Sequence, residues 1–327
     1  MKIADLEVGK TCDITLVVKS ATARETKAKK PYLALEFYDG TDTISGNYWD
    51  WSSGKIPEVN AILDVNAQVT EWQGKKQLNI KSIRTNTTRH ISEFAPTSGH
   101  DLSSIYKDAY ALISDVRDDM LRDLTLSILE ELREQWLTVP GAVSVHHAYT
   151  GGTLVHSLSV AKIAGAIAVN VPGANQDLCV VGGMLHDLGK LFTYRMNGVS
   201  ITMTDEGQLY EHLFMGAEFV LGFAENRIDA DDYINMKKLQ LLRHIILSHH
   251  GQLEYGSPVT PQCIEAFIVN HADSIDAAAE QIRVASRSVP DNVKWTDRIY
   301  TLNNRAQLTP DYINCIMVGA EEETVGN

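Results

Sequence analysis

The stretch "GGMLHDLGKLF" (182–192) sets a histidine beside an aspartate in a run that is otherwise mostly small or apolar. Apolar residues recur at helical spacing over 176–190, so the pair is expected on a packed helix. Burying two titratable side chains there costs desolvation free energy unless a partner compensates them. That partner is either a backbone carbonyl that bonds to the histidine, as is common in protein cores, or a metal ion.

The histidines of the chain are concentrated in one region. Eight of the eleven fall between residues 146 and 250: His146, His147, His156, His186, His212, His244, His249 and His250. Two aspartates, Asp273 and Asp276, follow in the helical segment "NHADSIDA" (270–277). Neutral imidazole nitrogens and carboxylate oxygens are natural ligands of divalent cations. Their density therefore favours a metal site over several isolated core histidines.

Length and composition indicate a globular protein of about two domains. The chain has 327 residues, of which 44% are hydrophobic and 22% charged. No apolar run approaches the roughly 20 residues of a membrane span, and the N-terminus "MKIADLEVGKTCD" lacks the apolar core of a signal peptide. Four scattered cysteines without CxxC spacing indicate free thiols. We therefore expect a cytoplasmic protein without a membrane partner or a zinc–thiolate site.

The net charge of −13 is unevenly distributed along the chain. Residues 1–90 hold 13 of the 29 basic and 11 of the 42 acidic residues, a balance of +2. The remainder holds 16 basic and 31 acidic residues, a balance of −15. A mildly basic N-terminal part is compatible with a nucleic-acid partner, although ordinary variation of surface charge explains it equally well.

The first ninety residues carry the pattern of a small β-barrel. Five runs are rich in β-branched and aromatic residues and partly alternate: 12–22, 31–39, 42–50, 61–72 and 75–84. Turn-forming segments such as "KAKKP" (27–31) separate them. Five short strands predict an oligonucleotide-binding (OB) type barrel, with a sandwich fragment or an SH3-like barrel as alternatives.

Aromatic and basic residues of this part are candidates for contacts with a nucleic acid. Trp49 and Trp72 fall at or beside strands, and Lys29 and Lys30 lie in a turn. Rings for base stacking and ammonium groups for phosphates are what a single-stranded nucleic-acid site requires. Core aromatics and solvated lysines are the ordinary alternative. These four residues are our candidate substrate contacts in the barrel.

The chain turns helical after a segment at 91–101 that looks like a linker. Apolar residues then recur at three- and four-residue steps in 104–137, 153–169, 176–190, 208–226, 235–249, 261–287 and 295–303. Strands followed by helices without alternation predict two separate domains. We expect an all-β barrel at 1–90, an all-α domain at 102–307 and an acidic tail at 308–327.

The ordered histidines and aspartates resemble the HD metallohydrolase superfamily. There, a His, a His-Asp pair, further His and a closing Asp come from successive helices of a bundle. With "HDLGK" and "SHHG" intact, the order is met here by His156, His186, Asp187, His212, His249, His250 and Asp273. The resemblance implies a helical HD-type domain with metal-dependent phosphohydrolase activity.

A five-stranded barrel joined to such a domain looks like the YhaM-type 3′→5′ exoribonucleases. Matching stretches are "HHAYTGGTLVHSLSVAKIA" (146–164), "GGMLHDLGK" (182–190), "LSHHGQLEYGSP" (247–258) and "TDRIYTLNN" (296–304). Most of residues 1–305 is covered, although the barrel matches by pattern more than by motif. The resemblance implies hydrolysis of single-stranded RNA, with single-stranded DNA as a further substrate.

The resemblance also implies two metal ions. One would be held by His156, His186, Asp187 and Asp273, and the second by His212, His249 and His250, with Asp187 bridging. The middle histidines favour two ions, because single-metal HD enzymes often lack them. Nitrogen and oxygen ligands suit Mn, Fe, Co or Mg, among which we place Mn first.

Two further residues receive roles from the resemblance. Lys190 lies three residues after Asp187 and shares its helix face. The family motif includes this lysine, and an ammonium there would stabilise developing phosphate charge; a lysine that complements the helix dipole is the alternative. His147, nine residues before His156 in a glycine-rich stretch, is assigned a substrate-phosphate contact.

Three functional classes fit these observations. The first is a metal-dependent 3′→5′ exoribonuclease in which Asp187 and Lys190 are catalytic. The second is an HD phosphodiesterase or phosphatase acting on a small or cyclic nucleotide, with the barrel as a regulatory or oligomerisation module. The third is a non-catalytic nucleic-acid-binding protein with a degenerate HD fold, which the intact ligand series disfavours. A homo-oligomer is compatible with all three.

Overall fold

The computed structural model describes residues 1–327 except 53, 97–98, 143–146, 226, 291–292 and 319–327. The chain divides into two compact units: Met1–Gly99 with Arg195–Thr202, and His100–Tyr194 with Met203–Asn327. Four parts of the sequence predictions lie outside the described residues. These are His146, position 226 at the end of the helix expected at 208–226, positions 97–98 of the expected linker, and positions 319–327 of the expected acidic tail.

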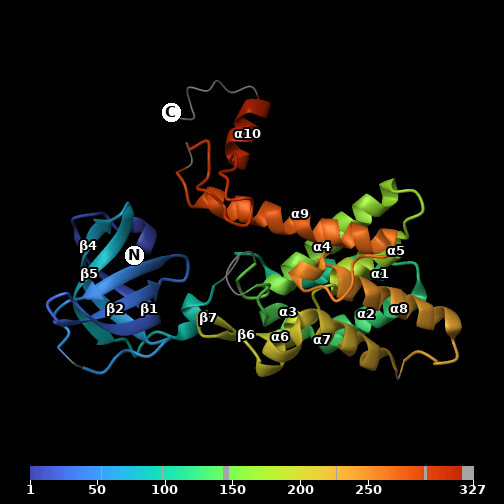
Figure 1. Cartoon of the computed structure of the whole chain (residues 1–327), viewed down its shortest axis with the longest axis horizontal. Coiled ribbons are helices and arrows are strands. Elements are labelled where there is room, and N and C mark those ends of the chain that lie inside the picture. The colour runs from blue at the N-terminus through green and yellow to red at the C-terminus, as the bar shows by residue number, and fades with distance from the viewer. Residues whose placement is uncertain (53, 97–98, 143–146, 226, 291–292, 319–327) are drawn as a thin grey trace. The chain divides into compact units, whose positions relative to one another are not determined.

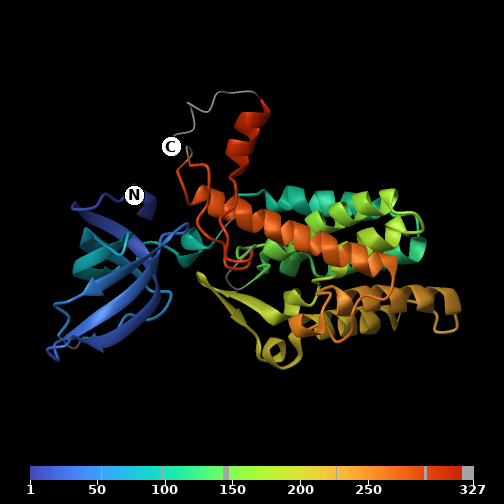
Figure 2. The same cartoon turned by 45° about the horizontal axis from the view of Figure 1, so that its top comes forward.

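The first unit is a closed five-stranded barrel (Figures 1 and 2). Its strands are β1 (Thr11–Glu25), β2 (Pro31–Tyr38), β3 (Thr43–Tyr48), β4 (Ile62–Trp72) and β5 (Lys75–Thr85). Their order around the barrel is β1-β2-β3-β5-β4, with β3 and β5 parallel and the other pairs antiparallel. Along β1, buried Cys12, Ile14 and Leu16 alternate with more exposed neighbours, as inward-facing strand positions do. The predicted OB-type barrel is confirmed.

Short segments outside the strands pack on the barrel. They include the 3₁₀ helices η1 (Ile3–Asp5) and η2 (Ile91–Phe94). Phe94 is buried in a small apolar cluster with Val17, Ile62 and Val199. The expected linker at 91–101 therefore begins with a packed turn, because its first apolar residues find a place against the barrel.

The second unit is helical and contains ten α-helices in the described part of the chain. They are α1 (Leu102–Ser114), α2 (Asp119–Glu131), α3 (Arg133–Thr138), α4 (Gly152–Asn170), α5 (Gln176–Leu185), α6 (Lys190–Thr193), α7 (Asp205–Glu225), α8 (Tyr233–Ser248), α9 (Ile264–Arg287) and α10 (Pro310–Met317). A 3₁₀ turn, η3 (Leu253–Tyr255), follows α8, and a hairpin of β6 (Tyr194–Asn197) and β7 (Ser200–Met203) joins α6 to α7. In Figures 1 and 2, α9 runs alongside α4.

The structure corrects several predicted elements. The run at 104–137 is three helices, because Asp118 caps a new helix by accepting a hydrogen bond from the backbone N–H of Leu121. The helix expected at 295–303 is wrong, since that segment makes isolated β-bridges from Trp295 to Leu308 and from Ile299 to Arg305. Helix α10 lies in the segment expected to be an acidic tail.

Helix α4 also departs from a sequence expectation. By length and apolar composition it could cross a membrane, although we expected no run of that size. Within the helical unit, 61% of its apolar window is buried. That burial is what a core helix requires, and α4 carries the first of the predicted metal ligands.

Candidate metal centre

Two closely crossing helices bring His156 and His186 together. A Cβ on Gly183 of α5 would lie 2.7 Å from Cα of Ala161 on α4, so the close approach of the two backbones requires glycine at this position. His156 lies on α4, and His186 is the C-cap of α5. Both rings are buried, with their Nε2 atoms 3.2 Å apart. The glycines that open "GGMLHDLGKLF" thus help to position its histidine.

The carboxylate of Asp187 is shared between two groups of imidazoles. Its Oδ2 lies 3.4 Å from Nε2 of His156 and 3.4 Å from Nε2 of His186. Its Oδ1 lies 3.4 Å from Nε2 of His212 and 3.6 Å from Nε2 of His249. Each oxygen therefore faces a separate set of ring nitrogens, as a bridging carboxylate must.

Close backbone packing positions His212 on α7. A Cβ on Gly189 would lie 1.9 Å from the carbonyl oxygen of His212, so the turn after Asp187 rests directly on the α7 backbone. Helix α7 is kinked at Glu211, whose φ of 60° and ψ of 158° are costly for a residue other than glycine. Strained backbone of this kind clusters at functional sites, and here it comes immediately before a candidate ligand.

The remaining ligands come from the end of α8 and from α9. His249 is the C-cap of α8, and His250 follows it. Ring nitrogens of these two residues and of the α7 histidine lie within 4.8 Å of one another. Asp273 on α9 has its Oδ1 3.1 Å from Nε2 of the α4 histidine. One turn earlier, Asn270 donates from Nδ2 to the carbonyl of His249 at 2.7 Å, which ties α9 to the end of α8.

Backbone carbonyls fix the orientation of three of these rings. The Nδ1 atoms of His186, His249 and His250 lie 2.7, 2.8 and 2.7 Å from the carbonyl oxygens of Gly183, Ile246 and Tyr255. A carbonyl only accepts, so each Nδ1 carries a proton, and in the neutral form of the ring Nε2 presents a lone pair. Each ring therefore bonds to a backbone carbonyl through Nδ1, as a core histidine does, and leaves Nε2 to contact a metal ion.

Burial and mutual proximity set the protonation of the centre. Burial opposes ionisation of Asp187, but Lys190 and His186 outweigh it and hold the pKa of this carboxyl well below its usual range. Burial also acts against the charged form of Lys190, yet the carboxylate 2.7 Å from its Nζ raises its pKa overall. Desolvation lowers the pKa of His212 and, more strongly, that of His249. The neutral imidazoles of His212 and His249 and the ionised carboxylate of Asp187 are forms that bind a cation. Burial opposes protonation of His156, but its hydrogen bonds with Asp187, Asp273 and Asp276 raise its pKa well above the usual value.

The residues present fit divalent metal ions. Among the described residues, Oδ1 of Asp187 and Nε2 of His212 are buried without a hydrogen-bond partner, a costly state for polar atoms. A cation between them would satisfy both. None of the four cysteines, all of which are described, belongs to the convergent groups. The nitrogen and oxygen donors suit Mn, Fe, Co or Mg.

His147, for which a substrate-phosphate contact was predicted, lies in a buried hydrogen-bond network. Its ring is buried, with Nε2 2.8 Å from Oδ2 of Asp276 and Nδ1 2.8 Å from the hydroxyl of Tyr149. Both ring nitrogens are engaged, so this geometry gives no support to the predicted phosphate contact. Sequence reasoning missed the roles of Asp276 and Tyr149. The three-residue spacing from Asp273 to Asp276 on one helix was the available signal for the former.

The four predicted nucleic-acid contacts in the barrel lie in two separate places. Lys29 and Lys30 are exposed in the β1–β2 turn. Trp49 follows β3, is 40% exposed, and packs against Tyr32 with ring centroids 4.4 Å apart and the ring planes tilted by 30°. Trp72 is 66% exposed and ends β4 beside the β4–β5 turn.

The register of strands β3, β4 and β5 shows that Trp49 and Trp72 lie apart. Strands β3 and β5 are parallel, with Asn47 opposite Asn79. Trp72 pairs with Lys75 at the start of β5, whereas Trp49 lies beyond the end of β3. The two exposed tryptophans therefore lie toward opposite ends of these strands.

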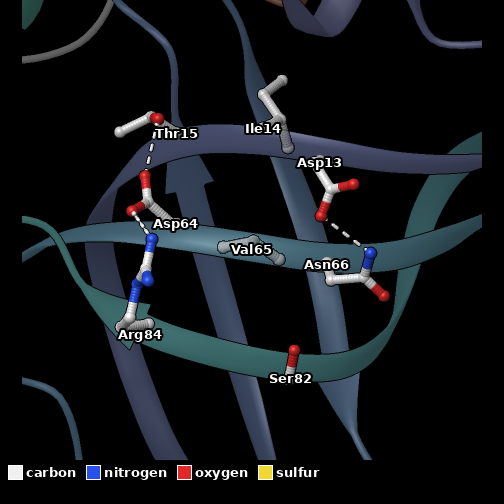
Figure 3. A pocket seen from close by; sticks show the side chains of 8 residues that line it. All are labelled: Asp13, Ile14, Thr15, Asp64, Val65, Asn66, Ser82 and Arg84. Carbon is white, nitrogen blue, oxygen red and sulfur yellow. Dashed lines mark hydrogen bonds and ion pairs between the residues drawn. The ribbon is translucent and has the colours of Figure 1, made fainter.

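A hollow on the outer face of β1, β4 and β5 is lined by polar side chains (Figure 3). Thr15 donates to Asp64 at 2.8 Å, Arg84 donates to the same carboxylate at 3.2 Å, and Asn66 donates to Asp13 at 2.8 Å. These groups satisfy one another, and two carboxylates beside one arginine do not favour a phosphate. We therefore do not place nucleic-acid contacts here.

Parts of the chain are similar to known proteins. Residues 153–278, which include all seven predicted ligands, match the HD domain family, and HD domains belong to a superfamily of metal-dependent hydrolases. A domain of replication protein A from Methanococcus maripaludis is 23% identical, with 26% of this chain and 92% of that chain covered and a TM-score of 0.24. The second OB-fold domain of replication protein A from the same organism is 18% identical, with 28% and 97% covered and a TM-score of 0.23. The finer assignment to the YhaM-type nucleases stays a prediction.

Proposed function

We propose that the protein is a metal-dependent 3′→5′ exonuclease acting on single-stranded RNA, with single-stranded DNA as a further substrate. The observation that carries the proposal is the carboxylate of Asp187, whose two oxygens face two different sets of imidazole nitrogens. When bound, a pair of divalent ions supplies Lewis-acid stabilisation to both the attacking and the leaving oxygen of an in-line displacement at phosphorus. One ion would be held by His156, His186, Asp187 and Asp273, and the other by His212, His249 and His250. Manganese is our first choice.

Lys190 is placed to stabilise charge on the substrate. Its side chain is 10% exposed, and its Nζ lies 2.7 Å from Oδ2 of Asp187. An ammonium has three N–H donors, and the contact with Asp187 uses one of them. The others can donate to a phosphoryl oxygen as negative charge develops there, a kind of stabilisation that is strongest in a water-excluded site.

The exposed end of the barrel supports a polymeric substrate. The adjacent rings of Tyr32 and Trp49 lie at the same barrel end as the exposed Lys29 and Lys30. Lys30 is 3.7 Å from Asp50, and because both side chains are mostly exposed, this ion pair is weak and can exchange for a phosphate. Stacking contributes roughly 1–3 kcal/mol per base, which a cyclic mononucleotide bound at the metal centre would not use.

The test is an incubation with Mn²⁺ and single-stranded RNA labelled at its 5′ end. Hydrolysis from the 3′ end gives a ladder of progressively shorter labelled products, whereas hydrolysis from the 5′ end releases a labelled mononucleotide at once. Parallel reactions contain mononucleotides and cyclic nucleotides, and an Asp187→Ala variant controls for contaminating nuclease. Turnover of small nucleotides with intact RNA would replace the proposal with the small-nucleotide phosphodiesterase.

A further inference from the structure

We infer that Asp276 is a positioning residue that holds the ligand His156, and that His147 and Tyr149 hold Asp276 in turn. The inference rests on the proposed metal centre and adds three residues outside its ligand set. It concerns how tightly one of the two ions is bound and does not depend on the identity of the substrate.

His156 differs from His186 and His249 in the group that lies behind its ring. Nδ1 of His186 and of His249 faces a backbone carbonyl, whereas Nδ1 of His156 lies 2.7 Å from Oδ2 of Asp276. On the opposite side of the ring, Nε2 lies 3.1 Å from Oδ1 of Asp273. Two carboxylates three residues apart on α9 therefore clamp one imidazole. A carboxylate behind a ligand fixes its tautomer and raises its basicity.

Asp276 is itself fully engaged. It is 4% exposed, its Oδ2 also lies 2.8 Å from Nε2 of His147, and its Oδ1 accepts a short hydrogen bond from Ser159 Oγ. Three side chains, His147, His156 and Ser159, therefore hold the Asp276 carboxylate in place behind the His156 ring.

Tyr149 sets the direction of the hydrogen bonds in this network. Burial and neighbouring carboxylates raise the pKa of its hydroxyl, so Tyr149 stays a neutral phenol. Its O–H can donate to Nδ1 of His147 across 2.8 Å, which leaves the proton of that ring on Nε2, facing Asp276. The donors from His147, His156 and Ser159 then all point at one carboxylate. These direct bonds satisfy the group without a cation among them.

The test compares Asp276→Asn with a matched control, Glu280→Gln. Glu280 lies one turn further along α9, is 6% exposed, and pairs with Arg283. Both substitutions turn a buried carboxylate into an amide of the same shape, but only Asp276 touches His156. Loss of a carboxylate behind a metal ligand typically weakens metal binding about 10–100-fold.

Calorimetric titration of the chelator-treated full-length protein with Mn²⁺ is the primary measurement. We expect Asp276→Asn to raise the dissociation constant of one ion about 10–100-fold and to leave the ion at His212, His249 and His250 nearly unchanged. Metal analysis after dialysis against limiting Mn²⁺ should then find about one ion where the unaltered protein and Glu280→Gln keep two. A merely structural role of Asp276 would weaken both sites together or neither.

A second variant keeps the inference testable if Asp276→Asn does not fold. His147→Gln leaves the Asp276 carboxylate in place and removes only its outer support, so it should weaken the same ion by a smaller factor. Unaltered Mn²⁺ affinity in both variants, or equal weakening by Glu280→Gln, overturns the inference. Mn²⁺ binding without RNA hydrolysis by the unaltered protein overturns the proposed function alone, because the titrations still decide the role of Asp276.

Discussion

Replacing Gly189 with alanine tests whether backbone packing after Asp187 builds the metal centre. The new Cβ would lie 1.9 Å from the carbonyl oxygen of His212, 2.7 Å from its carbonyl carbon and 2.8 Å from the backbone nitrogen of Gly216. Ordinary contact begins at 3.4 Å, so the turn and α7 must separate by about 1.5 Å. All three obstructing atoms belong to the backbone, which cannot rotate away as a side chain would.

Two measurable effects follow from this separation. Overpacking of a close contact costs about 1–3 kcal/mol, occasionally more, and a backbone clash of this size belongs at the upper end. At about 2–4 °C per kcal/mol for a domain of this size, Tm should fall by roughly 6–12 °C. The same movement carries Nε2 of His212 away from Oδ1 of Asp187, now 3.4 Å distant, so one ion should bind more weakly.

Gly222→Ala is the matched control on the same helix. Gly222 is exposed on α7, and a Cβ there would meet nothing within 4 Å. Alanine in a helix is favoured over glycine by roughly 0.5–1 kcal/mol, so this variant should be slightly stabilised and keep its metal. Thermal unfolding with chelator and Mn²⁺ content after dialysis measure both effects. If Gly189→Ala unfolds at the same midpoint as the unaltered protein and retains two ions, close packing does not position His212.

Three further variants address the centre and the barrel. Asp187→Ala should lose bound metal and hydrolysis together, because one carboxylate would serve both of the proposed ions; full metal occupancy with normal turnover would contradict the shared-ligand geometry. Lys190→Ala should retain metal while kcat falls on the order of 10²–10³, and an unchanged kcat would make this lysine structural. In the barrel, burial opposes ionisation of Asp39, but hydrogen bonds from the backbone N–H groups of Asp42 and Ile3 and from Thr41 lower its pKa. The ionised form therefore stabilises the barrel above the unfolded-state pKa of about 3.9, and this stability is lost as pH falls through the lower folded-state pKa. Asp39→Asn should cost about 1–3 kcal/mol at pH 7 and progressively less below pH 4 in urea unfolding, whereas a difference independent of pH would refute the assignment.

The barrel was predictable because strand alternation is a local property. The run predicted at 31–39 is β2 at Pro31–Tyr38, and the run predicted at 75–84 is β5 at Lys75–Thr85. Each strand presents one face to a closed core, so burial along it repeats the period visible in the sequence. Five such runs with turn signals between them leave few ways to close a sheet of this length.

The elements that sequence reasoning misplaced depend on turns. The β6–β7 hairpin surrounds Asn197-Gly198, a dipeptide typical of tight hairpin turns. Apolar residues at 295–303 mimic helical spacing, but Asn303 and Asn304 adopt φ values of 56° and 54°, which turn the chain back on itself. In both places the turn-forming residues predict the local structure better than the spacing of the apolar residues does.

The hydrogen bonds that hold the candidate ligands in place could not be predicted, because they join residues that are far apart in the sequence. The order of histidines and aspartates named the ligands by resemblance, and the fold brings those residues together. His147 and Asp276, by contrast, are 129 positions apart and meet only because α9 lies along α4. No local period relates two such residues, so the bond between His147 and Asp276 could not be predicted from the neighbourhood of either residue.

Helix ends explain why a titratable pair belongs in "GGMLHDLGKLF". His186 and His249 are each the C-cap of a helix, and each Nδ1 bonds to the carbonyl three residues earlier, Gly183 or Ile246. The last carbonyls of a helix lack intrahelical partners, so the same imidazole that satisfies a helix end turns its Nε2 toward the centre. At the ends of both α5 and α8, the same histidine therefore terminates the helix and directs its Nε2 toward the candidate metal centre. Because a backbone carbonyl holds each ring through Nδ1, the helix end itself orients the Nε2 atom that a metal site would use, which is the support by surrounding groups that such a site needs.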